Sequence, residues 1–166
     1  LNRMQFELLT NRDVRDVDAQ LAIGIEADEE AGTLTIRDTG VGMSRQELIE
    51  NLGTISKSGV RAFLEKAKSS NDGHISTALI GQFGVGFYSI FMVADEVIVH
   101  TLAYQPDSEP YRWISRGEES YEIEPGDKEV RGTEVILKLK DDAKEFLKDY
   151  TLRKIIQTHS NYIAFP

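Results

Sequence analysis

A period-two alternation of apolar and polar residues is the feature of this sequence that most restricts its fold. It is clearest in the stretch TEVILKLK, residues 133–140, where Val135, Leu137 and Leu139 fall on one face. Strands that bury one face against a core alternate in this way. The other stretches that read as strands are 21–28, 32–38, 96–104, 111–116 and 120–124. The sequence therefore predicts a sheet of mostly antiparallel strands with one covered face.

The first two of these strands are predicted to form a β-hairpin, with a capped helix after it. The turn-forming segment DEEAG separates the two alternating stretches, and the second strand ends at Asp38. Ser44 then stands where a helix N-cap is expected, and Glu47 three residues later completes the pattern of a capping box. Gly53 is placed to end this helix.

Further helices are predicted at both ends of the chain and after residue 86. Leu1, Met4 and Leu8 have helical spacing with no N-cap residue before them, so we expect a helix that is already under way at the first residue. The other predicted helices are 87–93, 142–149 and 151–163. Apolar residues of the first of these, expected to form a buried wall, are Phe87, Ile90, Phe91 and Val93.

The segment 54–86 has a different composition from its surroundings. It holds one short predicted helix, 60–68, between runs rich in serine, glycine and asparagine. Such runs are typical of a mobile loop or lid.

Composition narrows the classes of protein to which the chain can belong. Its 166 residues suit a single globular domain, and the lack of cysteine excludes disulfides and thiolate metal sites. The formal net charge of −9 argues against general binding to nucleic-acid backbones. The apolar runs are short, so neither a membrane span nor a secretory leader is expected, and the chain reads as intracellular. His74, His100 and His159 lack the spacing of a metal site.

The stretch LIGQFGVGFYS, residues 79–89, resembles a phosphate-binding loop without its lysine. Gly81 and Gly86 match the start of a P-loop, but Phe87 and Tyr88 stand where its lysine and hydroxyl residue belong. A Rossmann fingerprint fails as well, because Ser89 occupies the place of the third glycine. Glycines still let backbone amides converge on an anion. A turn that serves packing alone explains the same residues, and both interpretations stay open.

The stretch RDTGVGM holds a second candidate binding element. A strand that ends in Asp38 and runs into Gly40 and Gly42 lets a planar ligand approach the backbone while the carboxylate accepts from an amine. Aspartate and glycine are also ordinary turn formers, so the pattern alone is weak. Further candidates are Asn51 at the end of the capped helix, Lys57 six residues later, and Thr133 at the mouth of a late strand. Taken singly, each reads as an ordinary helix-end or surface residue.

Five motifs together resemble the N-terminal nucleotide-binding domain of the Hsp90 chaperone family, and most closely its bacterial branch. They are IRDTGVGM, LIENLGTISKSG, IGQFGVGFYS, RGTEVILKLK and HSNYIAFP, in the order and spacing of that domain. The resemblance extends over the whole chain. The wider superfamily includes gyrase B, the MutL proteins and sensor histidine kinases.

The resemblance implies a fold and a ligand. The fold is an α/β two-layer sandwich of the Bergerat type, with a mixed, mostly antiparallel sheet and helices on one face. The ligand is a bent ATP or ADP, with Mg²⁺ held through the phosphates. The segment 54–86 becomes the lid that closes over the nucleotide.

The resemblance also implies a role for each candidate residue. Asp38 bonds the adenine amine, helped by Thr133 through water, and Asn51 lies near the ribose or α-phosphate. Lys57 supplies a cation, and the 81–86 loop gives backbone amides to the phosphates. The full implied set is Asp38, Gly42, Met43, Asn51, Leu52, Lys57, Gly81, Gln82, Phe83, Gly84, Val85, Gly86, Phe87 and Thr133.

The catalytic residues of the family have no counterpart in these 166 residues. The resemblance places the general-base glutamate, and an asparagine that binds Mg²⁺, upstream of Leu1, so we expect a domain that lacks its first strand and first helices. ATP hydrolysis is then expected of the intact parent and not of this chain alone.

The implied parent is a cytoplasmic chaperone that assists client proteins and forms a homodimer through regions absent here, without nucleic-acid or membrane partners. Two alternatives stay open. One is an ATPase domain of the gyrase B, MutL or histidine kinase type, and the other is a nucleotide-binding module without hydrolysis.

Overall fold

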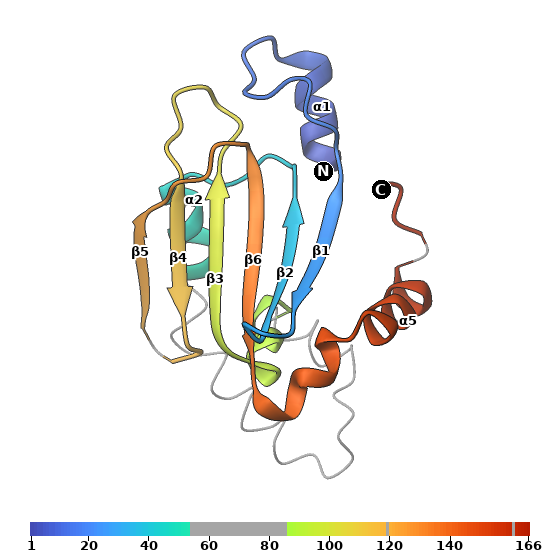
Figure 1. Cartoon of the computed structure of the whole chain (residues 1–166). Coiled ribbons are helices and arrows are strands. Elements are labelled where there is room, and N and C mark those ends of the chain that lie inside the picture. The colour runs from blue at the N-terminus through green and yellow to red at the C-terminus, as the bar shows by residue number, and fades with distance from the viewer. Residues whose placement is uncertain (54–85, 119, 161) are drawn as a thin grey trace.

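The computed structural model describes residues 1–53, 86–118, 120–160 and 162–166 (Figure 1). The predicted helix 60–68 lies outside these residues, as does the predicted lid except for Gly86.

Six strands form one sheet. They are β1 (Ile23–Asp28), β2 (Thr33–Asp38), β3 (Ala94–Leu102), β4 (Tyr111–Ser115), β5 (Tyr121–Pro125) and β6 (Gly132–Leu139). Their order across the sheet is β1-β2-β6-β3-β4-β5, so β6 inserts between the hairpin and the β3 to β5 meander. Every pairing within the described ranges is antiparallel. The predicted hairpin and the mostly antiparallel sheet are confirmed.

Helical segments cover one face of this sheet or lie at its β1 edge. They are α1 (Asn2–Thr10), α2 (Arg45–Leu48), η1 (Ile49–Gly53), η3 (Phe87–Met92), η4 (Asp141–Leu147) and α5 (Asp149–His159). Figure 1 shows α2 behind the sheet, with α1 and α5 towards its β1 edge. This arrangement confirms the predicted α/β fold with a helix-covered sheet.

The covered face carries the main core. Leu34, Leu137 and Val97 face each other across β2, β6 and β3, and all three are buried. Trp113 is fully buried on β4, with its ring centroid 5.9 Å from that of Phe87 and 6.0 Å from that of Tyr121. Burying a large apolar side chain contributes about 1.5–3 kcal/mol. The core therefore fixes the helices to the sheet.

Successive side chains point to opposite sides of the sheet, and the face turned away from the core, here called the polar face, carries charged residues around the half-buried Ile98, Ile114 and Ile136. Ion pairs cross this face between neighbouring strands or from loops. The pairs are Arg37 with Glu26, Arg112 with Glu124, Arg116 with Glu96, and Lys128 with Glu134.

The helical segment after the hairpin is capped at Ser44 and ends at Gly53 as predicted, but only its first part is an α-helix. The Ser44 hydroxyl accepts from the Glu47 amide at 3.3 Å, and the Glu47 carboxylate accepts from the Ser44 amide at 2.8 Å. The α-helix lasts only to Leu48 and continues as a π-turn to Gly53. A Cβ at Gly53 would lie 2.4 Å from the Tyr121 hydroxyl, so the segment ends in tight contact with β5.

The later helical segments also depart from ideal α-helices. Both η3 and η4 are 3-10 helices, and α5 ends at His159 instead of continuing to residue 163. Of the predicted wall, Phe91 is buried, while Phe87, Ile90 and Val93 are partly buried against the core. Apolar spacing alone does not distinguish a short 3-10 helix from an α-helix.

A second, smaller core joins α1 to the end of the sheet where β2 finishes. Met4, Val14 and Tyr104 are its buried residues, and Val41 packs against them. This core positions the loop that follows Asp38. None of the described helices is long and apolar enough to cross a membrane.

Candidate functional site

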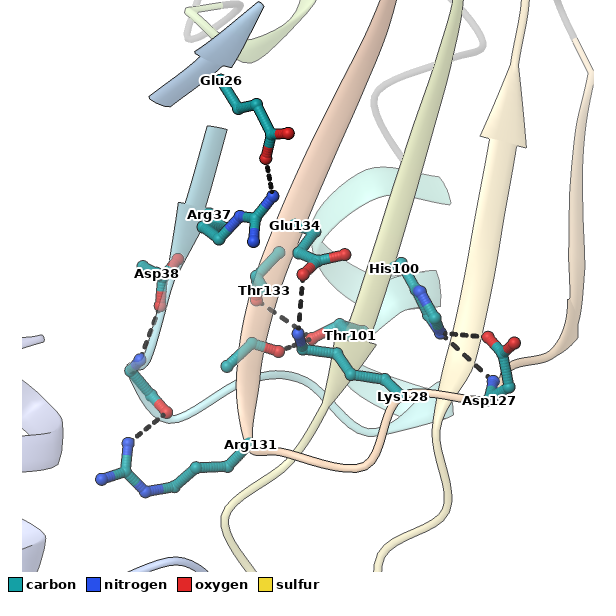
Figure 2. A network of polar contacts seen from close by, with 12 residues as sticks. Glu26, Arg37, Asp38, His100, Thr101, Asp127, Lys128, Arg131, Thr133 and Glu134 are labelled. Carbon is teal, nitrogen blue, oxygen red and sulfur yellow. Dashed lines mark hydrogen bonds and ion pairs between the residues drawn. The ribbon is translucent and has the colours of Figure 1, made fainter. Parts of the chain in front are cut away.

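Three polar side chains form a row across β2, β6 and β3 on the covered face, at the end of β2. Asp38 pairs with Thr133 across β2 and β6, and Thr133 pairs with Thr101 across β6 and β3. Figure 2 shows Thr133 between the other two. The rows next to them along the strands are apolar, with Ile36 opposite Val135. The covered face therefore changes from apolar to polar where the strands end.

Thr101 is the buried end of this row. Its side chain is fully withdrawn from solvent, and its hydroxyl accepts from the Met43 amide at 2.9 Å. The same hydroxyl donates to the Gly132 carbonyl at 3.2 Å and lies 3.0 Å from the Thr133 hydroxyl. Sequence reasoning did not single out Thr101. The available signal was a polar residue in the apolar phase of β3, after Val97 and Val99.

The loop after Asp38 and the start of β6 each have one position that only glycine allows. Gly42 has φ +62, and a Cβ there would lie 1.9 Å from the Leu102 carbonyl oxygen. Gly132 on the next strand has φ +114, and its Cβ would lie 2.1 Å from the Asp38 carbonyl oxygen. Side chains at these positions would be strained and would clash with backbone. The Gly42 backbone thus packs against the end of β3.

Asp38 itself is braced by the loop. Its Oδ1 accepts from the Gly40 amide at 2.7 Å. A carboxylate has about four lone-pair sites, so this bond leaves acceptor capacity for a ligand.

Arg131 is a buried cation beside Asp38 that sequence reasoning also missed. It is fully buried, and its guanidinium donates to the carbonyls of Thr39, Ala19 at 3.1 Å and Asp16 at 3.2 Å (Figure 2 shows the residue in place). Its backbone amide donates to the Asp16 carboxylate at 2.8 Å. Burial lowers the pKa of Arg131, while the negative charges of Asp16 and Asp38 oppose that change. Arg131 therefore ties the 15–19 segment to the loop that carries Asp38.

The other described candidates lie around α2, η1 and η3. Met43 is half-buried against the core, and Leu52 is buried within it. Asn51 is exposed on η1. Gly86 is exposed at the N-terminal end of η3, and Phe87 packs edge-on against Trp113. The candidates that fall outside the described residues are Lys57, Gly81, Gln82, Phe83, Gly84 and Val85.

Two adjoining cavities lie beside the sheet, one between β1, α5 and the C-terminal segment, and one between α5, η4 and the covered face, where Leu34 and Ile36 of β2 line it. Their volumes are about 360 and 330 Å³, and Ile25, Leu152 and Ile156 line both. Their charged lining residues, Asp149 and Arg153, already pair with each other at 2.7 Å. Size alone would favour this region. The row of Asp38, Thr133 and Thr101 is the better candidate for ligand recognition, because its hydrogen-bonding groups lie close together and do not form an ion pair with one another.

No group of three or more metal-ligating side chains gathers within the described ranges.

Comparison with known proteins adds two findings. Residues 7–134 match the family of histidine kinase-, DNA gyrase B-, and HSP90-like ATPases. The chain is also similar to bacterial proteins named chaperone protein HtpG, with 43% identity over 166 residues for that of Chlorobium chlorochromatii. The identity is 46% for that of Vibrio parahaemolyticus and 47% for that of Shewanella pealeana. Each alignment covers at least 99% of this chain and 26% of the relative, so the chain spans about a quarter of their length.

Proposed function

The chain belongs to the family of histidine kinase-, DNA gyrase B-, and HSP90-like ATPases, and from this premise we propose that it binds ATP and ADP at the Asp38 end of β2. The base would lie between the sheet and α2. Asp38 would accept from the adenine amine, with Thr133 beside it. Gly42, Met43 and Leu52 would surround the base, and Asn51 and Phe87 would border the sugar and phosphates.

The row of Asp38, Thr133 and Thr101 is the observation that carries this proposal. It joins a carboxylate to two hydroxyls on the covered face, next to the glycine loop that follows β2. A site built from hydrogen-bonding groups at an apolar boundary recognises a flat, mostly apolar ligand with a polar edge. A purine has this character.

The phosphate side of the site rests on the family resemblance. Lys57 and the segment 81–86 are proposed to hold the phosphates, and 54–86 is proposed to close over them as a lid. Mg²⁺ would enter with the nucleotide and neutralise phosphate charge. Of the described residues, Gly86 marks the point where this segment meets η3.

The activity of the whole protein is a further proposal, supported by the name of its relatives. We infer that the parent is a cytoplasmic, ATP-hydrolysing chaperone that acts on client proteins as a homodimer. We propose that these 166 residues belong to a single nucleotide-binding domain of that parent. By itself the chain would bind nucleotide with little turnover, because the family's general base has no counterpart in it and losing such a base costs about 10²- to 10⁴-fold in rate.

Calorimetric titration of ADP with Mg²⁺ into the purified chain tests the binding site. We expect saturable binding that Asp38→Asn weakens by about 10- to 100-fold, because the variant replaces a charged acceptor by an amide. Asp28→Asn is the matched control. Asp28 is exposed at the opposite end of the hairpin, so this variant should bind ADP with the affinity of the wild-type chain. Equal affinities for the wild-type chain and Asp38→Asn would contradict the site.

A further inference from the structure

The guanidinium of Arg131 bonds backbone carbonyls with all of its donors. A guanidinium has five N–H groups and no acceptor. Those of Arg131 donate to the carbonyl oxygens of Arg15 at 3.1 Å, Asp16 at 3.2 Å, Ala19 at 3.1 Å, Thr39, and Gly40 at 3.4 Å. The first three carbonyls belong to the segment 15–19, and the other two belong to the loop after β2. One buried side chain therefore joins two backbone segments that are distant in the sequence.

The segment 15–19 bonds Arg131 through its backbone and through a side chain. Asp16 has φ +53, in the left-handed region that residues other than glycine rarely adopt. Its carboxylate accepts from the Arg131 backbone amide at 2.8 Å, while its carbonyl accepts from the guanidinium. Such a backbone conformation persists only where surrounding contacts hold it. Arg131 supplies two of these contacts.

The peptide group between Thr39 and Gly40 joins Arg131 to Asp38. Its carbonyl accepts from the Arg131 guanidinium, and its N–H donates to Asp38 Oδ1 at 2.7 Å. Figure 2 shows this piece of backbone between the two labelled side chains. A peptide group is planar, so rotating it would break both hydrogen bonds together. The orientation of the Asp38 carboxylate therefore depends on Arg131.

We propose that Arg131 is a positioning residue for the nucleotide site, which holds the peptide group that orients Asp38 and makes nucleotide binding and the order of segment 15–19 depend on each other. This inference rests on the proposed nucleotide site. Arg131 is fully buried and would act through the loop without touching the ligand. The segment 15–19 contains none of the residues proposed to contact the nucleotide. Because coupling between two sites is reciprocal, ADP should order this segment as much as the segment supports ADP binding.

Calorimetric titration of ADP with Mg²⁺ into the wild-type chain and Arg131→Met measures the effect on affinity. Methionine keeps much of the side-chain volume but donates no hydrogen bond, so the peptide group between Thr39 and Gly40 is no longer held. We expect the affinity for ADP to fall by about 10- to 100-fold, because binding must then order the loop again. Affinities are compared per folded chain, with the folded fraction taken from the urea denaturation curve of the same variant. A merely structural role would leave this corrected affinity at the wild-type value.

Lys128→Met is the matched control, because it also removes a nearly buried cation from the connection between β5 and β6. The Lys128 side chain is 12% exposed, and its Nζ lies 3.3 Å from the carboxylate of Glu134 on the polar face. This ion pair lies on the opposite side of the sheet from the nucleotide site. Lys128→Met should therefore bind ADP with the affinity of the wild-type chain.

Hydrogen exchange in the wild-type chain gives a readout that does not depend on how well Arg131→Met folds. Saturating ADP should slow amide exchange in the segment 15–19 more than in η4, which follows the far end of β6. The comparison with η4 removes the general slowing that any ligand produces by stabilising the folded state. In Arg131→Met the additional slowing in 15–19 should disappear.

The outcomes separate this inference from the proposed function. Equal corrected affinities for the wild-type chain and Arg131→Met, or slowing in 15–19 no greater than in η4, would overturn the inference and leave the nucleotide site standing. An equal loss of affinity in Lys128→Met would also overturn it, since the effect would then follow from the lost charge or the altered connection. No binding of ADP to the folded wild-type chain would overturn the proposed function and the inference with it.

Discussion

Two arginines on opposite sides of the same sheet show how differently one residue type is used in this protein. Arg37 lies on the polar face, where its side chain is 47% exposed and pairs with Glu26. Arg131 is fully buried beside the covered face and bonds backbone carbonyls from two separate segments. Water can replace the partner of Arg37, whereas the side chain of Arg131 is withdrawn from solvent and depends on its protein partners. We therefore expect a buried polar side chain such as Arg131 to contribute more to the free energy of unfolding than an exposed one such as Arg37.

The largest expected effect follows from removing the buried cation. Arg131→Met keeps much of the side-chain volume but leaves the carbonyls of Thr39, Ala19 and Asp16 without donors. Each unpaired buried acceptor costs about 1–3 kcal/mol, so we expect a loss of about 3–5 kcal/mol in the free energy of unfolding. Urea denaturation followed by the fluorescence of the single tryptophan, Trp113, measures it.

Arg131→Lys is the matched control for this prediction. Lysine keeps the charge but cannot span the same set of carbonyls, so its loss of stability should be intermediate. If Arg131→Met unfolds at the same urea concentration as the wild-type chain, the buried arginine is no more important for stability than the exposed one.

A smaller, pH-dependent effect on stability is expected from His100, whose exposure lies between that of Arg131 and that of Arg37. Its side chain is 13% exposed, and its Nε2 accepts from the Asp127 amide at 3.2 Å. Burial lowers the pKa of His100, with Lys128 and Arg112 in the same direction, while the carboxylates of Asp127 and Glu134 oppose the change. The folded state therefore prefers the neutral imidazole.

The sign of the pH dependence follows from this preference. As pH falls through the ordinary histidine pKa of 6.5, the unfolded chain takes up the proton first, and the free energy of unfolding decreases. It levels off once His100 is protonated in the folded state as well. Denaturation curves between pH 8 and 5 should show this loss, and it should be smaller than the loss in the buried-arginine variant.

His100→Gln is the control for the pH series. Glutamine can accept from the same amide but does not titrate, so its stability should vary less over this range. An equal slope for both proteins would assign the pH dependence to other groups.

The smallest expected effect is on the polar face. Arg37→Ala removes an ion pair whose two side chains are 47% and 67% exposed. Such pairs contribute about 0–1 kcal/mol, so the midpoint of denaturation should move little. If sodium chloride at 1 M reproduces the small change in the wild-type chain, the pair acts by screened charge alone. A loss as large as that for Arg131→Met would remove the distinction between the faces.

Most of the regular fold could be predicted from local patterns. Alternation located all six described strands to within about two residues, and Ser44 with Glu47 marked the start of α2 correctly. The length and type of the later helices were not predicted, because local periodicity does not distinguish the 3-10 turns of η3 and η4 from an α-helix or mark the end of α5 at His159.

The candidate site also contains residues that the sequence indicated and residues that it did not. Asp38 stood out because an acidic residue at a strand end, followed by glycines, is a recognisable local pattern. Thr101 and Arg131 did not stand out. A threonine in a strand and an arginine in a loop are ordinary residues until their partners are known.

By itself, the sequence determined the strands, the polar and apolar faces of the sheet, the capped helix and the family to which the chain belongs. These properties depend on residues close together in the chain or on motifs in a set order. Only the tertiary structure decided that Thr101 meets Thr133 and Met43, and that Arg131 closes the loop beside Asp38. Those partners lie about 30 to 115 residues apart, and a hydrogen bond between them exists only after the sheet has formed.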